Sequence, residues 1–410
     1  MHIGILSDPA NFHTQKWARA LQKAGAKVTV FSFSQEWIKG VPCVSIEPKS
    51  TINGELTYRS YLAGGPDLFQ ELVRHRIDII NPINVTPFSV WGMRSGFRPM
   101  VSIAMGADIL EYPSRFAELE ISPERIWNSN ATKIGLLSKV QYRFKWSVFR
   151  RYIQQALEAS DLITGDNLEL VHAVRNWFGI PDERVKLNRW GVEPATFNTD
   201  EAKRSALREK YGVRDWQKVV LSPRGMKPVY QGDVILDAFE RLVRRGVRDL
   251  KLIMLSAGYD IPPKVDAKAI ALAEQFENFH YERSLLDRQE VIDLWSIVDS
   301  FVVAPVYDGY SNALAEGRYV GAIPIVNNIS AHRELLAHQE NAWMVDPFTP
   351  EHLADGILKV MEESEHWKGE FAPRNRAWIE AHSILDENIA SFLADCESVL
   401  RSKKVRQKRY

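Results

Sequence analysis

The chain has 410 residues, enough for two or three domains, and its 45% hydrophobic and 25% charged residues are typical of a soluble globular protein. The 52 basic and 52 acidic residues balance, which argues against nucleic acid as a partner, because nucleic-acid-binding proteins usually carry a basic excess. The two cysteines are too few for a disulfide framework, and no His or Cys spacing is typical of a metal site.

The first half of the chain alternates short apolar runs with longer helical patterns, which is the pattern of a parallel α/β sheet. After a strand at Ile3–Leu6, a helix over Thr14–Ala24 is expected to end before Gly25, because glycine favours the position that follows a helix. The other strands predicted in this half are Val28–Phe31, Asp78–Ile80, Val101–Ile103, Leu162–Thr164 and Val185–Leu187.

A second series of the same kind follows the polar stretch Glu193–Lys203, which is the best linker candidate. The strands predicted in this series are Val219–Leu221, Leu252–Leu255, Phe301–Ala304 and Ile323–Val326. The helices predicted between and after them are Asp233–Arg244, Asp287–Ile297, Ala313–Tyr319 and Pro350–Met361.

We therefore expect two Rossmann-like α/β domains with a cleft between them, over residues 1–195 and 196–378. Residues 379–410 should form a helix that returns to the first domain, followed by a basic tail. In such sheets ligands bind beyond the carboxyl ends of the strands, so the loops that follow the strands are the first place to look for a site.

One such loop carries two acids, Asp308 and Glu316, eight positions apart. An apolar strand ends at Pro305, a polar loop follows, and a helix opens at about Ala313. The loop and first helical turn contribute Gly309, Tyr310, Ser311, Asn312 and Ala313. Amides at a helix N-terminus bind phosphate, and carboxylates bind sugar hydroxyls, so this segment suits a nucleotide-sugar site. An ordinary loop Asp and a surface helix Glu are the structural alternative.

This block resembles the acid-x7-acid motif of retaining glycosyltransferases of family 4, which have the GT-B fold. The family's motif continues with a glycine turn into a Pro-hydrophobic-hydrophobic strand and a later Glu, and this chain has Gly321, Pro324 and Glu334 in that order. The resemblance implies that Asp308 contacts hydroxyls of the donor sugar and that Glu316 accepts both ribose hydroxyls. The family usually has Glu at the first acid position, so the shorter Asp leaves the identity of the sugar open.

The loop after the strand Val219–Leu221 supplies cations, Arg224 and Lys227. Fixed cations stabilise the charge that develops on a diphosphate leaving group. The family has an Arg and, five positions later, a Lys; Arg224 matches, whereas Val229 stands at the second position and Lys227 is the nearby substitute. A solvated basic loop is the alternative interpretation.

The first loop of the chain has no glycine-rich turn and no GxGxxG, so a nicotinamide-binding domain is not supported. It resembles instead the members of the family whose loop ends in His-Thr, here His13 and Thr14, before a helix that contains Trp. Asn11 and His13 are therefore counted as donor-binding candidates. His13 either lines the cleft or caps and packs against the first helix, and the sequence does not decide between these roles.

Two further segments resemble the family. Gly106 and Asp108 match a His-Gly-Ser/Thr-Asp motif whose His position is Met105 here, and Asp108 is a catalytic candidate with Asp308, Arg224 and Lys227. Gly191–Phe197 resembles the segment that closes the first domain, which we interpret as mainly structural.

The segment Lys139–Ile153 predicts a basic amphipathic helix. Its one-sided apolar residues are Tyr142, Trp146, Phe149 and Ile153, and its basic residues are Lys139, Arg143, Lys145, Arg150 and Arg151. Such a helix can lie on an anionic membrane, or it can pack on the domain core with a solvated basic face. The N-terminus is too quickly polar for a signal peptide and no stretch approaches about 18 apolar residues, so a cytoplasmic protein is expected, either free or peripheral at the inner face of the membrane.

Taken as a family member, the chain is expected to transfer a sugar with retention from a nucleotide-sugar donor to a carbohydrate or lipid-linked acceptor, without a metal or other cofactor, in polysaccharide or glycoconjugate assembly. Two alternatives stay open. One is a sugar phosphorylase or sugar-nucleotide epimerase on the same fold, and the other is a non-catalytic GT-B scaffold, which Met105 and the displaced Lys would suit.

Overall fold

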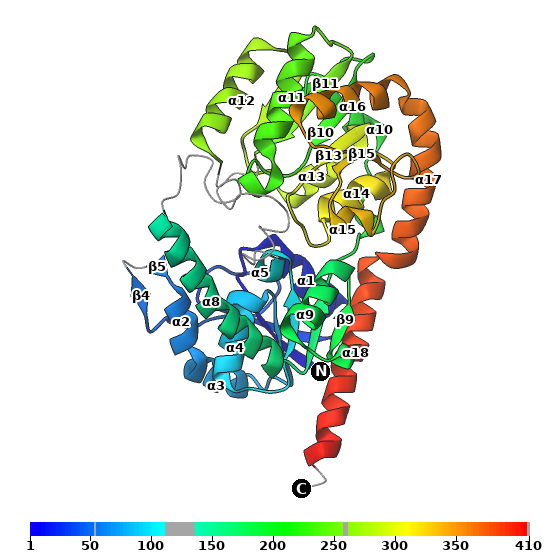
Figure 1. Ribbon diagram of the computed structural model, residues 1–410. Helices are drawn as coiled ribbons and strands as arrows, with labels where there is room; N and C mark the ends of the chain where they lie inside the picture. Colours follow the sequence, from blue (N-terminus) through cyan, green and yellow to red (C-terminus); the bar gives the residue numbers. More distant parts are fainter. Residues whose placement is uncertain (53–54, 111–135, 257–260, 408–410) are drawn as a thin grey trace. The chain divides into compact units, whose positions relative to one another are not determined.

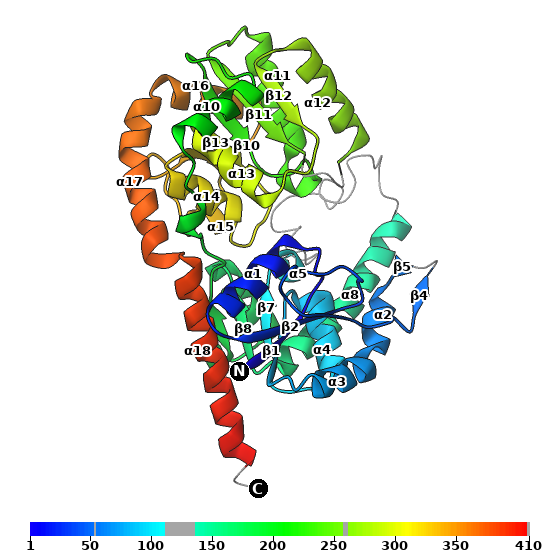
Figure 2. The same ribbon diagram turned by 180° about the vertical axis from the view of Figure 1, so that it is seen from behind.

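The computed structural model describes residues 1–52, 55–110, 136–256 and 261–407 (Figure 1). The described residues form two compact units. The first unit contains residues 1–110, 136–190 and 385–407, and the second contains residues 191–384, so the chain leaves the first unit after Trp190 and returns to it at Leu385. Figure 2 gives the opposite view of the same elements.

The first unit is built on parallel strands in the order β3-β2-β1-β6 and β7-β8-β9, which parallel bridges from Ile80 to Met100 and from Ile83 to Ile103 join. Its strands are β1 (His2–Leu6), β2 (Lys27–Ser32), β3 (Cys43–Ser45), β6 (Ile79–Pro82), β7 (Val101–Ala104), β8 (Leu162–Gly165) and β9 (Val185–Leu187), with a separate antiparallel pair, β4 (Thr51–Ile52) and β5 (Glu55–Leu56). Its helices are α1 (Phe12–Lys23), α2 (Tyr58–Ala63), α3 (Gly65–Arg74), η1 (Val85–Ser89), α4 (Val90–Ser95), α5 (Ala107–Leu110), α8 (Leu136–Ala159), α9 (Leu168–Phe178), η2 (Asp182–Arg184) and α18 (Leu385–Gln407).

The second unit has a parallel sheet in the order β12-β11-β10-β13-β14-β15. Its strands are β10 (Lys218–Ser222), β11 (Leu250–Leu255), β12 (Phe279–Glu282), β13 (Ser300–Val303), β14 (Ile323–Asn327) and β15 (Trp343–Val345). Its helices are η3 (Pro194–Thr196), α10 (Glu201–Lys210), η4 (Pro228–Tyr230), α11 (Gly232–Arg244), α12 (Pro263–Gln275), α13 (Arg288–Leu294), η5 (Trp295–Ile297), α14 (Asn312–Val320), α15 (Ser330–Arg333), α16 (Pro350–Glu362) and α17 (Ser364–His382).

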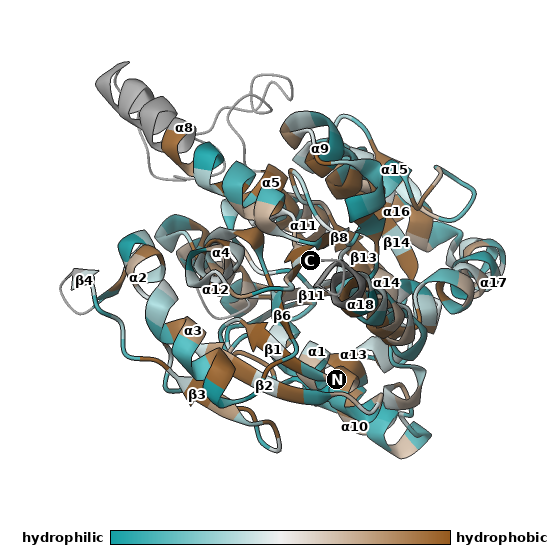
Figure 3. Cartoon of the chain, turned by 90° about the horizontal axis from the view of Figure 1, so that it is seen from below, coloured by the Kyte–Doolittle hydropathy of each residue, from teal (hydrophilic) through white to brown (hydrophobic). Residues whose placement is uncertain are grey.

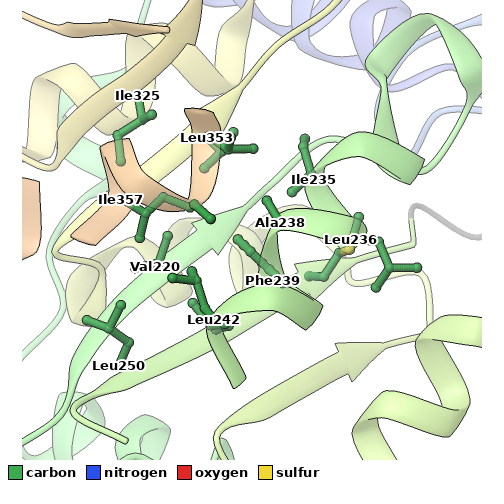
Figure 4. Packing of buried hydrophobic residues seen from close by; sticks show 14 of the residues in the cluster. Val220, Ile235, Leu236, Ala238, Phe239, Leu242, Leu250, Ile325, Leu353 and Ile357 are labelled. Carbon is green, nitrogen blue, oxygen red and sulfur yellow. The ribbon is translucent and has the colours of Figure 1, made fainter. Parts of the chain in front are cut away.

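The central strands are buried along their whole length, as expected for parallel sheets covered by helices; these are β1, β6, β7, β8, β11, β13 and β14. In the second unit, side chains of α11 and α16 pack on one face of the sheet around Val220, Phe239 and Leu353 (Figure 4). The other face packs against η5 and α14. In the first unit β1 and β2 are largely hydrophobic along their length (Figure 3), and every residue of β1 is buried.

The C-terminal helix α18 completes the core of the first unit, which confirms the expected return of the chain to that domain. Leu385, Ile389, Phe392 and Cys396 are all buried there, and the ring of Phe392 lies 5.0 Å from that of Trp17. The first helix also ends as expected: α1 closes at Lys23, and Gly25 has φ +89°.

Every strand expected from the sequence is present, but β3, β4, β5, β12 and β15 were not anticipated. β12 reads Phe-His-Tyr-Glu, and β15 has only the residues Trp343–Val345, so neither shows a continuous apolar run. β3, β12 and β15 lie at sheet edges, where a strand needs less apolar surface, and β4 and β5 form a separate two-stranded pair. Among the described helices none is both long and apolar enough to cross a bilayer, and no cluster of metal-ligating side chains occurs in the described part of the chain.

The close contact between α14 and β13 predicts a large cost for one added methyl group. A Cβ on Gly317 would lie 2.5 Å from a ring carbon of Phe301, whereas a Cβ on Gly369 of α17 would meet nothing within 4 Å. We expect Gly317→Ala to lower the free energy of unfolding by about 1–3 kcal/mol and Gly369→Ala to raise it by about 0.5–1 kcal/mol. Urea denaturation midpoints test this; a Gly317→Ala variant as stable as the parent would contradict the packing described.

Candidate functional site

The candidate site lies where the strand order of the second sheet reverses. From β10 the chain moves to β11 on one side, and from β13 it moves to β14 on the other. The loops that follow β10 and β13, residues 223–231 and 304–311, therefore leave from the carboxyl ends of two adjacent strands. This is the topological switch point at which doubly wound sheets bind ligands.

Arg224 is held at this point by groups from both loops. Its Nη1 donates to Asp308 Oδ2 at 2.8 Å and to Ser311 Oγ at 2.7 Å, and its Nη2 reaches Asp308 Oδ1 at 3.4 Å. The guanidinium carbon also lies 4.2 Å from the centre of the Tyr230 ring. A planar fork held by a carboxylate and a ring has little rotational freedom, so the position of the charge is fixed before a ligand arrives.

The charge state of Arg224 is equally fixed. Burial alone would lower the pKa of Arg224, but the neighbouring Asp308 carboxylate raises that pKa above its ordinary value. The guanidinium is therefore positive at every pH at which the protein is folded.

Backbone and side-chain hydrogen bonds join the two loops. Gln231, which has φ +51°, donates from Nε2 to the carbonyl of Ala304 at 2.9 Å, and the amide of Val306 donates to the carbonyl of Val229 at 2.8 Å. Asn327 of β14 donates to the carbonyl of Pro305 at 2.6 Å. These bonds fix the loops at the switch point relative to each other.

Helix α14 begins inside this arrangement. Ser311 is its N-cap, and the Ser311 Oγ accepts from the amide of Leu314 at 3.3 Å as well as from Arg224. Asn312 and Ala313 are the first two residues of the helix, so their amides lie at its positive end. The preceding loop turns at Gly309, whose amide donates to Asp308 Oδ1 at 3.0 Å. Tyr310, also in this loop, is buried. Arg224 therefore lies beside the N-terminus of a nine-residue helix, and this arrangement is suited to bind an anion.

Glu316 lies in the second turn of α14 and is 2% exposed. Its Oε1 accepts from Arg288 of α13 at 2.5 Å, and its Oε2 accepts from the indole of Trp295 at 3.2 Å. Each carboxylate oxygen keeps a further lone pair that can accept a hydroxyl. The sequence analysis did not identify Arg288 or Trp295 as neighbours of this acid; nothing in their local pattern marks them.

Two further residues singled out in the second unit are Lys227, three positions after Arg224, and Glu334. Lys227 is half-buried and precedes the short turn η4, with its carbonyl accepting from the amide of Tyr230 at 2.8 Å. Glu334 follows directly after α15.

His332 is a buried group that the sequence analysis did not single out. Its Nδ1 lies 2.9 Å from the carbonyl oxygen of Asn327, so Nδ1 carries the proton and Nε2 is an acceptor without a partner in the described structure. Burial lowers the pKa of His332 to about 4, while the nearby Asp308 raises it and Arg224 lowers it further. The ring is therefore neutral at neutral pH.

Asp108 of the first unit joins two loops. Its Oδ2 accepts from the amide of Val85 at 2.6 Å and its Oδ1 from the amide of Met105 at 3.0 Å. Burial raises the pKa of Asp108 to about 6, and the amide hydrogen bonds oppose that rise. Both oxygens thus stabilise the loops that follow β6 and β7.

Asn11 and His13 lie at the start of α1. The Asn11 side chain caps the helix by accepting from the amide of His13 at 2.8 Å. The His13 ring lies 5.1 Å from the ring of Trp190 and 5.6 Å from that of Phe12. His13 thus packs against neighbours in its own unit, and its contact with a donor stays a prediction.

Part of the predicted basic amphipathic helix falls outside the described residues, because the side chains of α8 before residue 148 are not described. In the described part, Ile153 is buried, and Phe149 packs at 4.6 Å from the ring of Tyr58. Arg150 donates to the carbonyl of Trp177 at 3.2 Å. The apolar face of this part therefore packs on its own unit, whereas Arg151 is exposed.

Sequence comparison extends over both units. The profile of the family described as glycosyl transferases group 1 matches residues 203–380, and the profile described as glycosyl transferase 4-like matches residues 2–138. An uncharacterized glycosyltransferase of Methanocaldococcus jannaschii is 20% identical over 188 residues, which is 45% of this chain and 47% of that relative, so the match spans about half of the relative's length.

Solved structures share the fold over nearly the whole chain. HepE of Anabaena, in complex with UDP and glucose, has a TM-score of 0.72 at 16% identity and covers 97% of this chain and 99% of its own; HepE is also known in complex with UDP-glucose. WaaG, a glycosyltransferase involved in lipopolysaccharide biosynthesis, has a TM-score of 0.68 at 17% identity and covers 95% of this chain and 98% of its own. Both family profiles and the shared GT-B fold lead to one assignment: the chain belongs to the GT4-like glycosyltransferases.

Proposed function

We propose that the protein transfers a sugar from a nucleoside diphosphate donor to a hydroxyl acceptor, with retention at the anomeric carbon and without a metal ion. The observation that carries the proposal is Arg224, fixed by Asp308 and Ser311 beside the N-terminus of α14. A diphosphate leaving group gains negative charge as the glycosidic bond breaks, and a cation that is already in place stabilises that charge without reorganisation.

The donor would lie across the switch point of the second unit. Its diphosphate would face Arg224 and the amides of Asn312 and Ala313, its ribose hydroxyls would bind Glu316, and its sugar would contact Asp308. Because HepE binds UDP and UDP-glucose, a UDP-sugar is the first donor to test. The cation and helix amides would do the work that a metal ion does in other transferases.

Retention would follow from displacement on one face of the sugar. The bond from the anomeric carbon to the diphosphate oxygen breaks, a bond from that carbon to the acceptor oxygen forms on the same face, and the acceptor proton passes to the departing diphosphate. Arg224 is placed to stabilise the charge on the leaving group. A carbohydrate or lipid-linked acceptor in polysaccharide or glycoconjugate assembly would suit the resemblance to WaaG.

Two measurements test this proposal: a thermal-shift screen for the donor, and calorimetry of donor binding to a variant of Glu316. We expect UDP or another nucleoside diphosphate, and more so one of its sugar conjugates, to raise the melting temperature, because a ligand that binds the native state stabilises it. Glu316→Gln keeps an acceptor for Trp295 but removes the charge, so calorimetry should give a dissociation constant about 10- to 150-fold higher, as expected for a charge-assisted hydrogen bond of about 1.5–3 kcal/mol.

Glu340→Gln, at an exposed position of the same unit, is the matched control and should leave the dissociation constant unchanged. Equal donor binding by Glu316→Gln and the parent protein would exclude the ribose contact. No thermal shift with any nucleotide or conjugate would favour the non-catalytic scaffold instead.

A second prediction concerns the leaving group. With the donor from the screen, Arg224→Ala should lower kcat by about 100- to 1000-fold, the usual loss when one fixed donor to a developing anion is removed. Arg283→Ala removes an exposed arginine paired with Asp266 and should have little effect. Release of nucleoside diphosphate measures both rates; equal losses in the two variants would contradict a specific role for Arg224.

A third prediction tests peripheral membrane contact through α8. We propose that the exposed basic side chains of this helix bind anionic lipid. Arg151 is the residue to test, because it is exposed, whereas Arg150 also donates a hydrogen bond to the carbonyl of Trp177. In liposome flotation with anionic vesicles, Arg151→Glu should reduce the floated fraction and Arg245→Glu, in the second unit, should not. Equal flotation of Arg151→Glu and the parent would argue against this contact.

A further inference from the structure

The second unit has a pocket of about 740 Å³ at the edge of its sheet opposite to Arg224. The pocket is formed where β10, β11 and β12 begin, by residues that precede these strands, by Lys251 of β11 and by the end of α10. The five residues of β10 separate it from the carboxyl edge by about 17 Å. A ligand bound here would not touch the groups of the candidate active site.

The pocket has an excess of positive charge. Its lining contains Arg208, Arg214, Arg248 and Lys251 against two carboxylates, those of Glu209 and Glu277. Glu277 is paired with Arg214 at 2.9 Å, whereas Arg248 has no ion-pair partner among the described residues. Arg208 is held in place because its Nη2 donates to the carbonyls of Arg214 and Gln217. A concave surface with this charge attracts anions.

Lys251 places an ammonium group in the lining. The residue is 5% exposed, and its Nζ donates to the carbonyl of Glu277 at 2.6 Å, which leaves two further N–H donors to be satisfied. Burial lowers the pKa of Lys251, Glu277 partly offsets this, and the nearby Arg214 lowers it further. A phosphate group at this position would accept hydrogen bonds from the remaining N–H donors of Lys251 and would compensate the positive charge of its ammonium group.

Asn278 contributes a buried amide to the wall of the pocket. Asn278 is 3% exposed and lines the pocket; its Nδ2 donates to the carbonyl of Val247 at 2.7 Å, which fixes the orientation of the amide. Its Oδ1 is buried and has no hydrogen-bond partner.

The indole of Trp216 forms an apolar part of the lining although the residue is 56% exposed. A large exposed aromatic side chain among cations offers a flat face on which a sugar or a base can stack. An anion alone would leave this face in water.

We propose that this pocket binds a small phosphate monoester carried on a polar ring, a sugar phosphate or a mononucleotide. The phosphate would bind Lys251 and Arg248, and the ring would stack on Trp216. The site is separate from the donor site, and occupancy of one does not require occupancy of the other.

The test uses three probes that differ by one group each: inorganic phosphate, ribose 5-phosphate and adenosine 5′-monophosphate. We expect both ring compounds to bind the full chain in calorimetry and to raise its melting temperature more than inorganic phosphate does. Trp216→Ala should raise their dissociation constants by about 5- to 150-fold, the range for loss of one stacking contact. Arg248→Ala should weaken all three probes. Tighter binding of the mononucleotide would identify a base on Trp216, and equal binding would identify a sugar phosphate; both results support the site.

The controls are matched by residue type. Trp37→Ala removes an indole that is 69% exposed in the first unit, and Arg245→Ala removes an exposed arginine paired with Asp355; neither should change binding of the probes. Because Trp216 and Arg248 are exposed, their variants should fold, which the melting temperature without ligand checks. Equal binding of inorganic phosphate and the ring compounds would overturn the proposal. Binding that is weakened by Glu316→Gln but not by Trp216→Ala would place the probe at the donor site and overturn it as well.

Discussion

The pairing of Arg224 with Asp308 is the interaction on which the candidate site depends. A guanidinium that is largely withdrawn from water is costly unless a carboxylate compensates its charge, and here the carboxylate comes from the loop after the neighbouring strand. The pair fixes the position of the Arg224 charge, and it also holds the two loops against each other. The positive end of α14 adds to the attraction that the Arg224 guanidinium exerts on an anion.

The strand order makes this pairing possible. In an order that places β10 beside β13, two loops separated by about eighty residues of chain leave from adjacent strand ends. Local bonds then fix their shape, in particular the contact of Gln231 with Ala304 and the cap that Ser311 provides to α14. The site is rigid because it is made from short loops on buried strands, and such an arrangement is suited to stabilise a charge that appears only during the reaction.

Much of the fold followed from the sequence because buried parallel strands and their helices leave strong apolar patterns, as at β10 and α11. The edge strands β12 and β15 were missed, since an edge strand is short and mixed in polarity. For the site, the spacing of Asp308 and Glu316 located the loop and helix, but spacing along the chain carries no information on partners far away in sequence. The contacts of Glu316 with Arg288 and Trp295, and the buried His332, therefore became visible only in three dimensions. Asp108 was identified by its motif, but its bonds to two backbone amides were not.

The return of α18 to the first unit has a consequence for the order in which the protein is made. Domains at the start of a chain usually fold while the remainder is still being synthesised. Here the core around Trp17 is complete only when Phe392 and Cys396 are present, and these residues follow the whole second unit in the chain. The second unit, whose residues all lie before Leu385, has its whole core available earlier. The unit whose synthesis begins earlier is therefore completed later. Until α18 has been made, the apolar surface that it covers has to be protected from contact with other chains.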